Sequence, residues 1–279
     1  MKLRALKDLP TSVNLIQKGQ EFIEEVEQRA LDWISTGYAE KLTPPPLRAK
    51  VATPPLSTPG PEAFGAPAAG LPIWAGCTVA IIASGESLST EQCAQVEEWR
   101  AMRADARVIA INTSFRRAPF ADILYACDGV WWRTVDPETR VSYFAEARKL
   151  FPLESLWTQD ETAAKEFSLR FIASRRGADL SMHPGVVAQG ANSAIQAMNL
   201  AVHFGTKRFI LLGVDGRGKH WHADHPSPLS NSLPHRAWRG SFKTFAADLS
   251  AQGIDTVNCS PGTAVEAFRL GDLTEELAK

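Results

Sequence analysis

Cysteine is scarce in this chain, and its four copies are scattered. Cys77, Cys93, Cys127 and Cys259 form no Cys-x-x-Cys pair, and residues 1–5 do not resemble the start of a secretion signal. Apolar runs are short as well, and none approaches the roughly 20 residues that a membrane-spanning helix needs. We therefore expect a reduced, cytoplasmic protein without a membrane span.

An excess of charge of either sign is also missing. The chain has 30 lysines and arginines against 31 aspartates and glutamates, so its formal net charge is -1. Such a chain has no global field that would attract nucleic acid or an anionic membrane, and we expect no nucleic-acid partner. Apolar residues make up 44% of the 279 residues, which is enough to build a sizeable core.

Proline is distributed unevenly along the chain. Half of the 18 prolines lie between Pro44 and Pro72, among glycines and alanines. A segment of this composition buries too little apolar surface to offset its ordering entropy, so we predict a linker over residues 44–72. Residues 1–43 alternate weakly between apolar and polar positions, which predicts a small β-rich module. This module carries no catalytic constellation, and we expect it to dock a partner.

Residues 73–279 alternate between short apolar runs and helical patterns. Serine at position 89 and glutamine three residues later form a capping-box pattern, which predicts a helix start. Further helices are predicted over 189–202 and 236–251, and strands over 78–83, 108–111, 122–126, 209–214 and 256–258. Such alternation predicts a Rossmann-like α/β domain with a mostly parallel sheet and helices on both faces.

Gly85 stands between the first strand and the first helix of this pattern, in the segment Ala-Ser-Gly-Glu-Ser at 83–87. A glycine at this place allows the backbone to approach a phosphate at the helix N-terminus, where unpaired N–H groups attract anions. The segment is neither a Gly-x-Gly-x-x-Gly nor a Walker A motif. An ordinary tight turn between strand and helix is therefore an equal alternative.

Polar residues stand at the ends of several predicted strands. Asn112, Asp128 and Asp215 each follow an apolar run, and Gly190-Ala-Asn-Ser193 precedes a helix. Each of them alone fits a local turn or a helix cap. Because the carboxyl ends of parallel strands share one edge of the sheet, these residues together with Ser84 predict a ligand cleft at that edge.

Four of the six histidines, His220, His222, His225 and His235, follow the strand at 209–214. His220, His222 and His225 have the short spacing of zinc ligands, with Asp224 as an added oxygen donor. Alternate residues of an extended loop need not converge on one ion, however. The sequence therefore favours hydrogen bonding to a phosphate or sugar over a metal.

Tryptophans occur beside these candidate residues, at Trp221 and in the pair Trp131-Trp132. They predict either packing or stacking on a sugar or base, and packing is the more common use of tryptophan.

Six segments in this order carry a family resemblance: residues 79–88, 109–112, 190–193, 210–215, His235 and 257–261. Together they resemble the bacterial sialyltransferases that build lipooligosaccharide. They are also similar to related domains, which include the flagellin-modifying motility-associated factors and the archaeal 6-hydroxymethylpterin pyrophosphokinase. The resemblance covers about residues 78–268, while residues 1–43 resemble the short N-terminal modules of bacteriophage proteins.

This resemblance implies roles for individual residues. It assigns Ser84, Gly85, Ser87 and Asn112 to a cytidine nucleotide, and it makes His235 the general base. The small-residue turn before the family's long helix corresponds to residues 190–193.

The chain also departs from the family pattern. It has Ala-Ser-Gly-Glu-Ser where the family has Gly-Asn-Gly-Pro-Ser. It supplies Arg217, His220 and His222 where two family tyrosines contact the leaving phosphate. These departures leave the identity of the donor open.

From the pattern and the resemblance we predict a glycosyltransferase-like enzyme that transfers a sugar from a nucleotide-linked donor to a hydroxyl acceptor. No tightly held cofactor is implied. The predicted catalytic residues are His235, Arg217 and His222, and the predicted nucleotide-binding residues are Ser84, Gly85, Ser87, Asn112, Asp128, Gly190, Asn192, Ser193 and Asp215.

Two other functions fit the same sequence. One is diphosphate transfer from a nucleoside triphosphate, with Asp128 or Asp215 holding Mg²⁺. The other is a phage-related assembly or binding protein that has kept the fold without the chemistry.

Overall fold

The chain divides into two units, residues 1–58 and 59–279. The computed structural model describes five short strands within the first 41 residues by their backbone. It then describes residues 70–222, 224–229 and 235–279, of which 235–237 are described by their backbone alone. The predicted linker at 44–72 lies almost wholly outside the described residues, so it stays a prediction.

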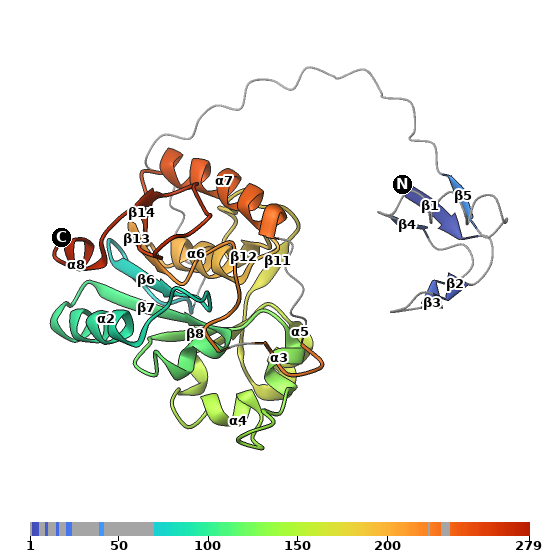
Figure 1. Ribbon diagram of the computed structural model, residues 1–279, viewed down its shortest axis with the longest axis horizontal. Helices are drawn as coiled ribbons and strands as arrows, with labels where there is room; N and C mark the ends of the chain where they lie inside the picture. Colours follow the sequence, from blue (N-terminus) through green and yellow to red (C-terminus); the bar gives the residue numbers. More distant parts are fainter. Residues whose placement is uncertain are drawn as a thin grey trace. The chain divides into compact units, whose positions relative to one another are not determined.

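The described part of residues 1–41 is made of strands, as the sequence predicts. Strand β1 (Lys2–Ala5) pairs antiparallel with both β4 (Glu21–Ile23) and β5 (Ala39–Lys41). Strands β2 (Leu9–Pro10) and β3 (Leu15–Ile16) form a second antiparallel pair (Figure 1). The described residues of the N-terminal module therefore lie in β-strands.

The second unit is built on an eight-stranded sheet in which every pair of neighbours is parallel. Its strand order is β10-β9-β8-β7-β6-β13-β14-β15. These strands are β6 (Thr78–Ile82), β7 (Ala106–Ile111), β8 (Ile123–Tyr125), β9 (Leu156–Thr158), β10 (Arg170–Phe171), β13 (Arg208–Leu212), β14 (Asp255–Asn258) and β15 (Arg269–Leu270). Strands β11 (Ala173–Arg175) and β12 (Val186–Ala188) form a separate parallel pair.

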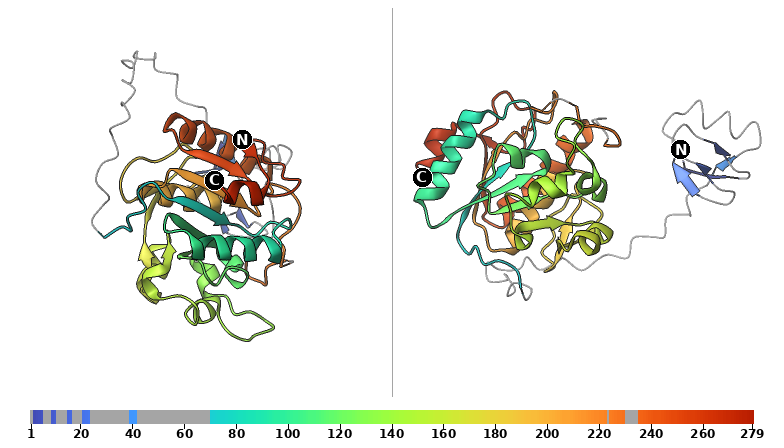
Figure 2. Two further views of the ribbon diagram at one scale, coloured as in Figure 1. Left: turned by 90° about the vertical axis from the view of Figure 1, so that its left-hand side faces the viewer. Right: turned by 90° about the horizontal axis from the view of Figure 1, so that it is seen from below.

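Helices cover both faces of this sheet, because alternate residues of its buried strands point to opposite sides. In β6, Val79 and Ile81 pack into one core, under α6 (Ser193–His203) and α7 (His235–Ala251). Ala80 and Ile82 pack into the other. That second face carries α2 (Thr90–Met102), α3 (Gly129–Arg133), α4 (Tyr143–Ala147), α5 (Glu161–Phe167) and α8 (Leu273–Leu277). Helices α2 and α8 lie side by side (Figure 2). The predicted Rossmann-like α/β fold is confirmed.

The start of α2 follows from a local signal that the sequence shows. The Ser89 hydroxyl accepts a hydrogen bond from the Gln92 N–H at 3.1 Å, and the Gln92 side chain accepts one from the Ser89 N–H at 3.1 Å. These two bonds satisfy N–H groups that have no partner inside the helix. The predicted capping box is confirmed.

Helix α6 begins later than the apolar pattern predicts. Gly190 and Ala191 have φ angles of 54° and 53°, which lie in the left-handed region and cannot continue a right-handed helix. The helix starts after them, and the Asn192 side chain caps it by accepting a hydrogen bond from the Ala194 N–H at 2.8 Å. Helix α7 agrees with its predicted range to within one residue.

The strand order reverses between β6 and β13. From β6 the chain runs outward through β7, β8 and β9 to β10, then returns to the other side of β6 and continues with β13, β14 and β15. In open α/β sheets, ligands bind outside the carboxyl ends of the strands at such a reversal. We therefore expect a ligand site at the turns that follow Ile82 and Leu212.

Among the described residues, every helix is too short or too polar to span a bilayer.

A cluster of charged side chains joins α8 to the edge of the sheet. The Glu276 carboxylate accepts hydrogen bonds from Arg208 of β13 at 2.5 Å, Arg269 of β15 at 2.6 Å and Lys279 at 2.8 Å. Its side chain is only 3% exposed. The hydrogen bond from Arg269 is the main reason why the pKa of Glu276 falls to about 2.

We expect Glu276→Gln to lower the free energy of unfolding by about 1–2 kcal/mol near pH 7, because Arg269 and Lys279 are half exposed and water screens them. A carboxyl whose folded pKa is lowered stabilises the fold fully above its unfolded pKa. It loses that contribution as the pH falls through its folded pKa. The difference from the wild type should thus shrink by more than half between about pH 7 and about pH 3 in urea unfolding.

Glu275→Gln, a change at an exposed neighbour, is the control and should change stability little at either pH. A Glu276→Gln effect that is the same at both pH values, or larger in acid, would contradict this account.

Candidate functional site

A cleft of about 470 Å³ lies over the carboxyl ends of β6, β7, β8 and β13. The turns after these four strands line it, together with the first turn of α6 and side chains of α7. Among the lining residues are Ser84, Gly85, Asn112, Asp128, Asn192, Ser193, Asp215, Arg217, Lys219, His220, His225, Trp238 and Phe242. The cleft therefore lies at the reversal of the strand order, and it gathers most of the residues that the sequence singled out.

The turns after β6 and β13 are in direct backbone contact. The Gly85 N–H donates to the Gly213 carbonyl at 2.8 Å. A Cβ on Gly85 would lie 2.5 Å from that carbonyl oxygen and 2.5 Å from Asp215 Cγ, and a Cβ on Gly213 would lie 2.5 Å from the Ala83 oxygen. Only glycine fits at these two positions.

This packing changes the interpretation of Gly85. The backbone N–H groups of Gly85, Ser87 and Leu88 all donate to protein oxygens, so they are not available to a phosphate. The space beside Gly85 is taken by the turn after β13. Of the two alternatives that the sequence left open, the tight turn describes the local structure.

Asp215 and Ser87 hold the same pair of turns together. The Asp215 carboxylate accepts hydrogen bonds from the Ser87 N–H at 2.9 Å and from the Ser87 hydroxyl at 2.5 Å. Burial raises the pKa of Asp215, and the bonds from Ser87 oppose that rise. Asp215 lines the cleft, whereas Ser87 does not. Ser87 therefore influences the cleft by holding the Asp215 carboxylate in place.

The other strand-end residues differ in their local roles. Asn112 has a left-handed backbone with φ of 50°, and the Asp128 side chain makes no capping bond in the described start of α3. The Ser84 hydroxyl is 3.0 Å from that of Ser114. Ser193 lies beside Cys127, with Oγ and Sγ 3.2 Å apart.

Gly190 has a structural role in the turn before α6 and does not line the cleft. Its N–H donates to the Gly177 carbonyl at 2.8 Å. A Cβ at this position would lie 2.7 Å from Ile195 Cγ2.

Two cationic residues of the loop after β13, Arg217 and Lys219, line the cleft. Arg217 is 53% exposed, and its guanidinium donates to the Gly262 carbonyl and lies 4.0 Å from the Glu86 carboxylate. The backbone N–H of Lys219 donates a hydrogen bond to the Glu86 carboxylate at 3.3 Å. Glu86 follows Gly85, so the loop that carries both cations is attached to the turn after β6.

Gln159 also lines the cleft, and the sequence analysis missed it. It directly follows β9, the strand beside β8. Its Oε1 is buried and has no hydrogen-bond partner within the described part of the chain. Like Asn112 and Asp128, it is a polar residue directly after a strand. The sequence did not reveal it because the strand before it has only three residues.

Cys127 is a second missed lining residue. Burial raises the pKa of its thiol, so the thiol is neutral and has little nucleophilic character.

The tryptophans are mainly packing residues, as the sequence favoured. Trp131 and Trp132 are 2% and 0% exposed, and their rings meet edge to face at 4.9 Å. The Arg117 guanidinium lies 4.0 Å from the Trp221 ring centroid. Trp131 is the one of these three that also lines the cleft.

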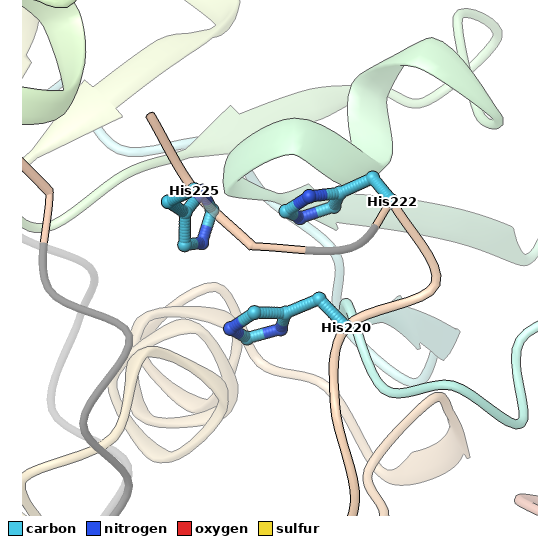
Figure 3. Close-up of side chains that lie close together, drawn as sticks. All are labelled: His220, His222 and His225. Atoms are coloured by element: carbon cyan, nitrogen blue, oxygen red, sulfur yellow. The ribbon is translucent and has the colours of Figure 1, made fainter. Parts of the chain in front are cut away.

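Three histidines converge at the edge of the cleft. His220, His222 and His225 each offer a ring nitrogen, and these nitrogens all lie within 4.8 Å of one another (Figure 3). Their ring centroids are 4.6 to 5.1 Å apart. The loop thus brings together the imidazoles that sequence spacing alone did not show to converge.

His235 is the first residue of α7, and its side chain lies outside what the structure describes. Its position precedes Trp238 by three residues and Phe242 by seven. Positions at this spacing share one face of a helix, and both aromatic residues line the cleft.

No protein-family model matches this chain, and no curated protein matches its sequence. Among solved structures, the chain is similar to the sialyltransferase CstII from Campylobacter jejuni, in complex with a substrate analogue, cytidine 5'-monophosphate. The two are 10% identical, and the similarity covers 71% of this chain and 86% of that one with a TM-score of 0.40.

Because the two turns are in contact, adding a single methyl group at Gly85 should destabilise the fold. We expect Gly85→Ala to lower the free energy of unfolding by about 1–3 kcal/mol, because the new Cβ meets a backbone oxygen that has little room to move. Gly240→Ala is the matched control, since a Cβ there meets nothing within 4 Å. It should raise helix stability by about 0.5–1 kcal/mol. Urea unfolding measures both changes, and a Gly85→Ala protein as stable as the wild type would show that the turns are farther apart.

Proposed function

We propose that the cleft binds a nucleotide-linked sugar donor and that the protein transfers the sugar to a hydroxyl acceptor. The observation that carries this proposal is the position of the cleft, over the carboxyl ends of β6 and β13 where the strand order reverses. In open α/β sheets, ligands bind at this place. A glycosyltransferase-like activity suits the groups that line it.

Two sources of positive charge lie at the cleft, beside the carboxylates of Asp128 and Asp215. Arg217 and Lys219 supply two full charges, and Arg–phosphate hydrogen bonds are charge-assisted and therefore strong. The start of α6, with Ala191 and the N-cap Asn192 before it, also lines the cleft, and the N-terminus of a helix attracts anions. These groups take over the phosphate recognition that the sequence assigned to the turn at Gly85.

Uncharged polar groups suit the rest of a nucleotide-linked donor. Asn112, Gln159 and Asn192 present amide groups, and Asp128 presents a carboxylate that accepts hydrogen bonds from sugar hydroxyls. The buried Gln159 oxygen has no partner in the described part of the chain, so a donor N–H or O–H would satisfy it.

The reaction would be a direct displacement. A base takes the proton of the acceptor hydroxyl while the hydroxyl oxygen bonds to the anomeric carbon of the donor. The bond between that carbon and the phosphate oxygen breaks, and the electron pair leaves with the nucleotide. Arg217 and Lys219 stabilise the negative charge that develops on the departing phosphate. We assign the base to His235, whose position shares a helix face with two lining residues.

Sugar transfer suits the cleft better than Mg²⁺-dependent diphosphate transfer. Mg²⁺ needs several oxygen ligands, and both oxygens of Asp215 already accept hydrogen bonds from Ser87. The remaining candidate carboxylate from the sequence analysis is Asp128. A single carboxylate leaves the diphosphate alternative with weaker support.

Nucleotide binding is tested by thermal unfolding of the full chain with CMP, UDP, GDP or ATP, with and without Mg²⁺. A ligand that binds the native state raises the melting temperature, and we expect at least one of the four to do so without Mg²⁺. Arg217→Ala should weaken its binding by about 1.5–3 kcal/mol, the range for hydrogen bonds to charged groups. Arg176→Ala removes an exposed cation that does not line the cleft and should have no effect. If none of the four shifts the transition, the non-catalytic alternative is favoured.

The role of His235 is tested by kinetics. His235→Ala should lower the turnover rate by roughly 10²- to 10⁴-fold, the usual contribution of a general base, with little change in donor affinity. A mere capping role would instead cost about 1 kcal/mol of stability and leave turnover unchanged. Nucleotide release from the donor that binds, with His183→Ala as control for an exposed histidine, separates the two outcomes. Near-normal turnover in His235→Ala would refute the assignment.

A further inference from the structure

The histidine cluster has a geometry that the proposed sugar transfer does not require. Three imidazoles on a tetrahedral ion at 2.0–2.1 Å have nitrogens about 3.3 Å apart. The candidate nitrogens of His220, His222 and His225 already lie within 4.8 Å of one another, so small side-chain rotations bring them to that spacing. All three come from one loop segment of six residues (Figure 3).

The orientation of His220 is fixed from outside the cluster. Its Nδ1 lies 3.3 Å from the Ser84 carbonyl oxygen, and a carbonyl only accepts, so Nδ1 carries the proton. Nε2 of the same ring therefore holds a lone pair for a ligand bond. Such an outer hydrogen bond on the second nitrogen is the usual support of a metal-bound histidine. A β-bridge between Gly85 and His220 and a hydrogen bond from the Trp221 N–H to Ser84 hold the backbone in place.

His222 has a buried nitrogen that nothing in the described residues satisfies. Its Nε2 makes no hydrogen bond there, although an unsatisfied buried polar atom costs about 1–3 kcal/mol. Its ring stacks on that of His220 with an angle of 7° between the planes. A metal ion bound to this nitrogen would satisfy it.

From this arrangement we propose that His220, His222 and His225 bind one divalent transition-metal ion of the Zn²⁺ type. Three nitrogen ligands favour Zn²⁺, Co²⁺ or Ni²⁺ over Mg²⁺ and Ca²⁺, which prefer oxygen. His220 and His225 line the cleft, while His222 does not. An ion held by all three would lie at the edge of the cleft, and catalytic zinc sites with three protein ligands keep a fourth position for a water or substrate.

An open position on that ion would take an oxygen of a phosphate bound in the cleft. This part of the inference rests on the proposed function, because it needs a nucleotide-linked donor in the cleft. An ion there would stabilise the charge on the departing phosphate as a Lewis acid, beside Arg217 and Lys219. The metal site itself depends only on the geometry of the three histidines and not on the proposed function.

The metal site is tested by titrating the metal-free full chain with Co²⁺ and following its visible absorption, then displacing Co²⁺ with Zn²⁺. We expect one equivalent to bind and millimolar Mg²⁺ to leave the spectrum unchanged. His222→Ala and His225→Ala should each weaken Co²⁺ binding by more than the roughly 10- to 100-fold that the loss of an outer partner costs. His183→Ala should bind Co²⁺ as the wild type does.

Circular dichroism of each metal-free variant checks that its fold is retained. Failure of the wild type to bind Co²⁺, or binding that survives both His222→Ala and His225→Ala, would overturn the proposal.

Adding nucleotide to the Co²⁺-loaded protein separates this inference from the proposed function. A nucleotide that stabilises the protein and changes the Co²⁺ spectrum supports phosphate ligation. A nucleotide that stabilises the protein but leaves the spectrum unchanged overturns phosphate ligation and leaves nucleotide binding intact. If Co²⁺ binds and no nucleotide does, the proposed function fails while the metal site stands.

Discussion

The site depends on the backbone contact between the turns after β6 and β13. Gly85 and Gly213 allow the two turns to meet at 2.8 Å, and Asp215 joins the second turn to the first through Ser87. This contact lies at the point where the strand order of the sheet reverses. The loop after β13 is in turn held by Ser84, whose carbonyl accepts bonds from the histidine loop. The cationic side chains and the histidine cluster therefore keep their places at the cleft only while this contact persists.

The fold was predictable where a local signal is strong. The buried runs at β6, β7, β8 and β13 are apolar over several residues, and the capping box before α2 is confirmed by its two hydrogen bonds. Strands β9 to β12 and β15 and helices α3, α4 and α5 were missed, because elements of two to seven residues carry little periodicity. The late start of α6 follows from left-handed backbone at Gly190 and Ala191. An apolar pattern continues through such residues and does not reveal the conformation.

The candidate site was predictable through topology more than through motifs. Because parallel strands end at one edge, Asn112, Asp128 and Asp215 could be expected at one cleft, and they line it. The role of Gly85 depends on a tertiary contact with a turn more than 120 residues away, which no local pattern encodes. The convergence of the histidines has the same origin. It depends on the hydrogen bonds that attach their loop to Ser84.

The most direct test of a ligand site at the reversal of the strand order is a crystal structure of the full chain. It would be grown with the nucleotide that raises the melting temperature most. The account predicts density for that nucleotide over the carboxyl ends of β6 and β13, with its phosphate beside Arg217. Density for the nucleotide elsewhere on the protein, with the cleft between these two turns left without it, would contradict the account.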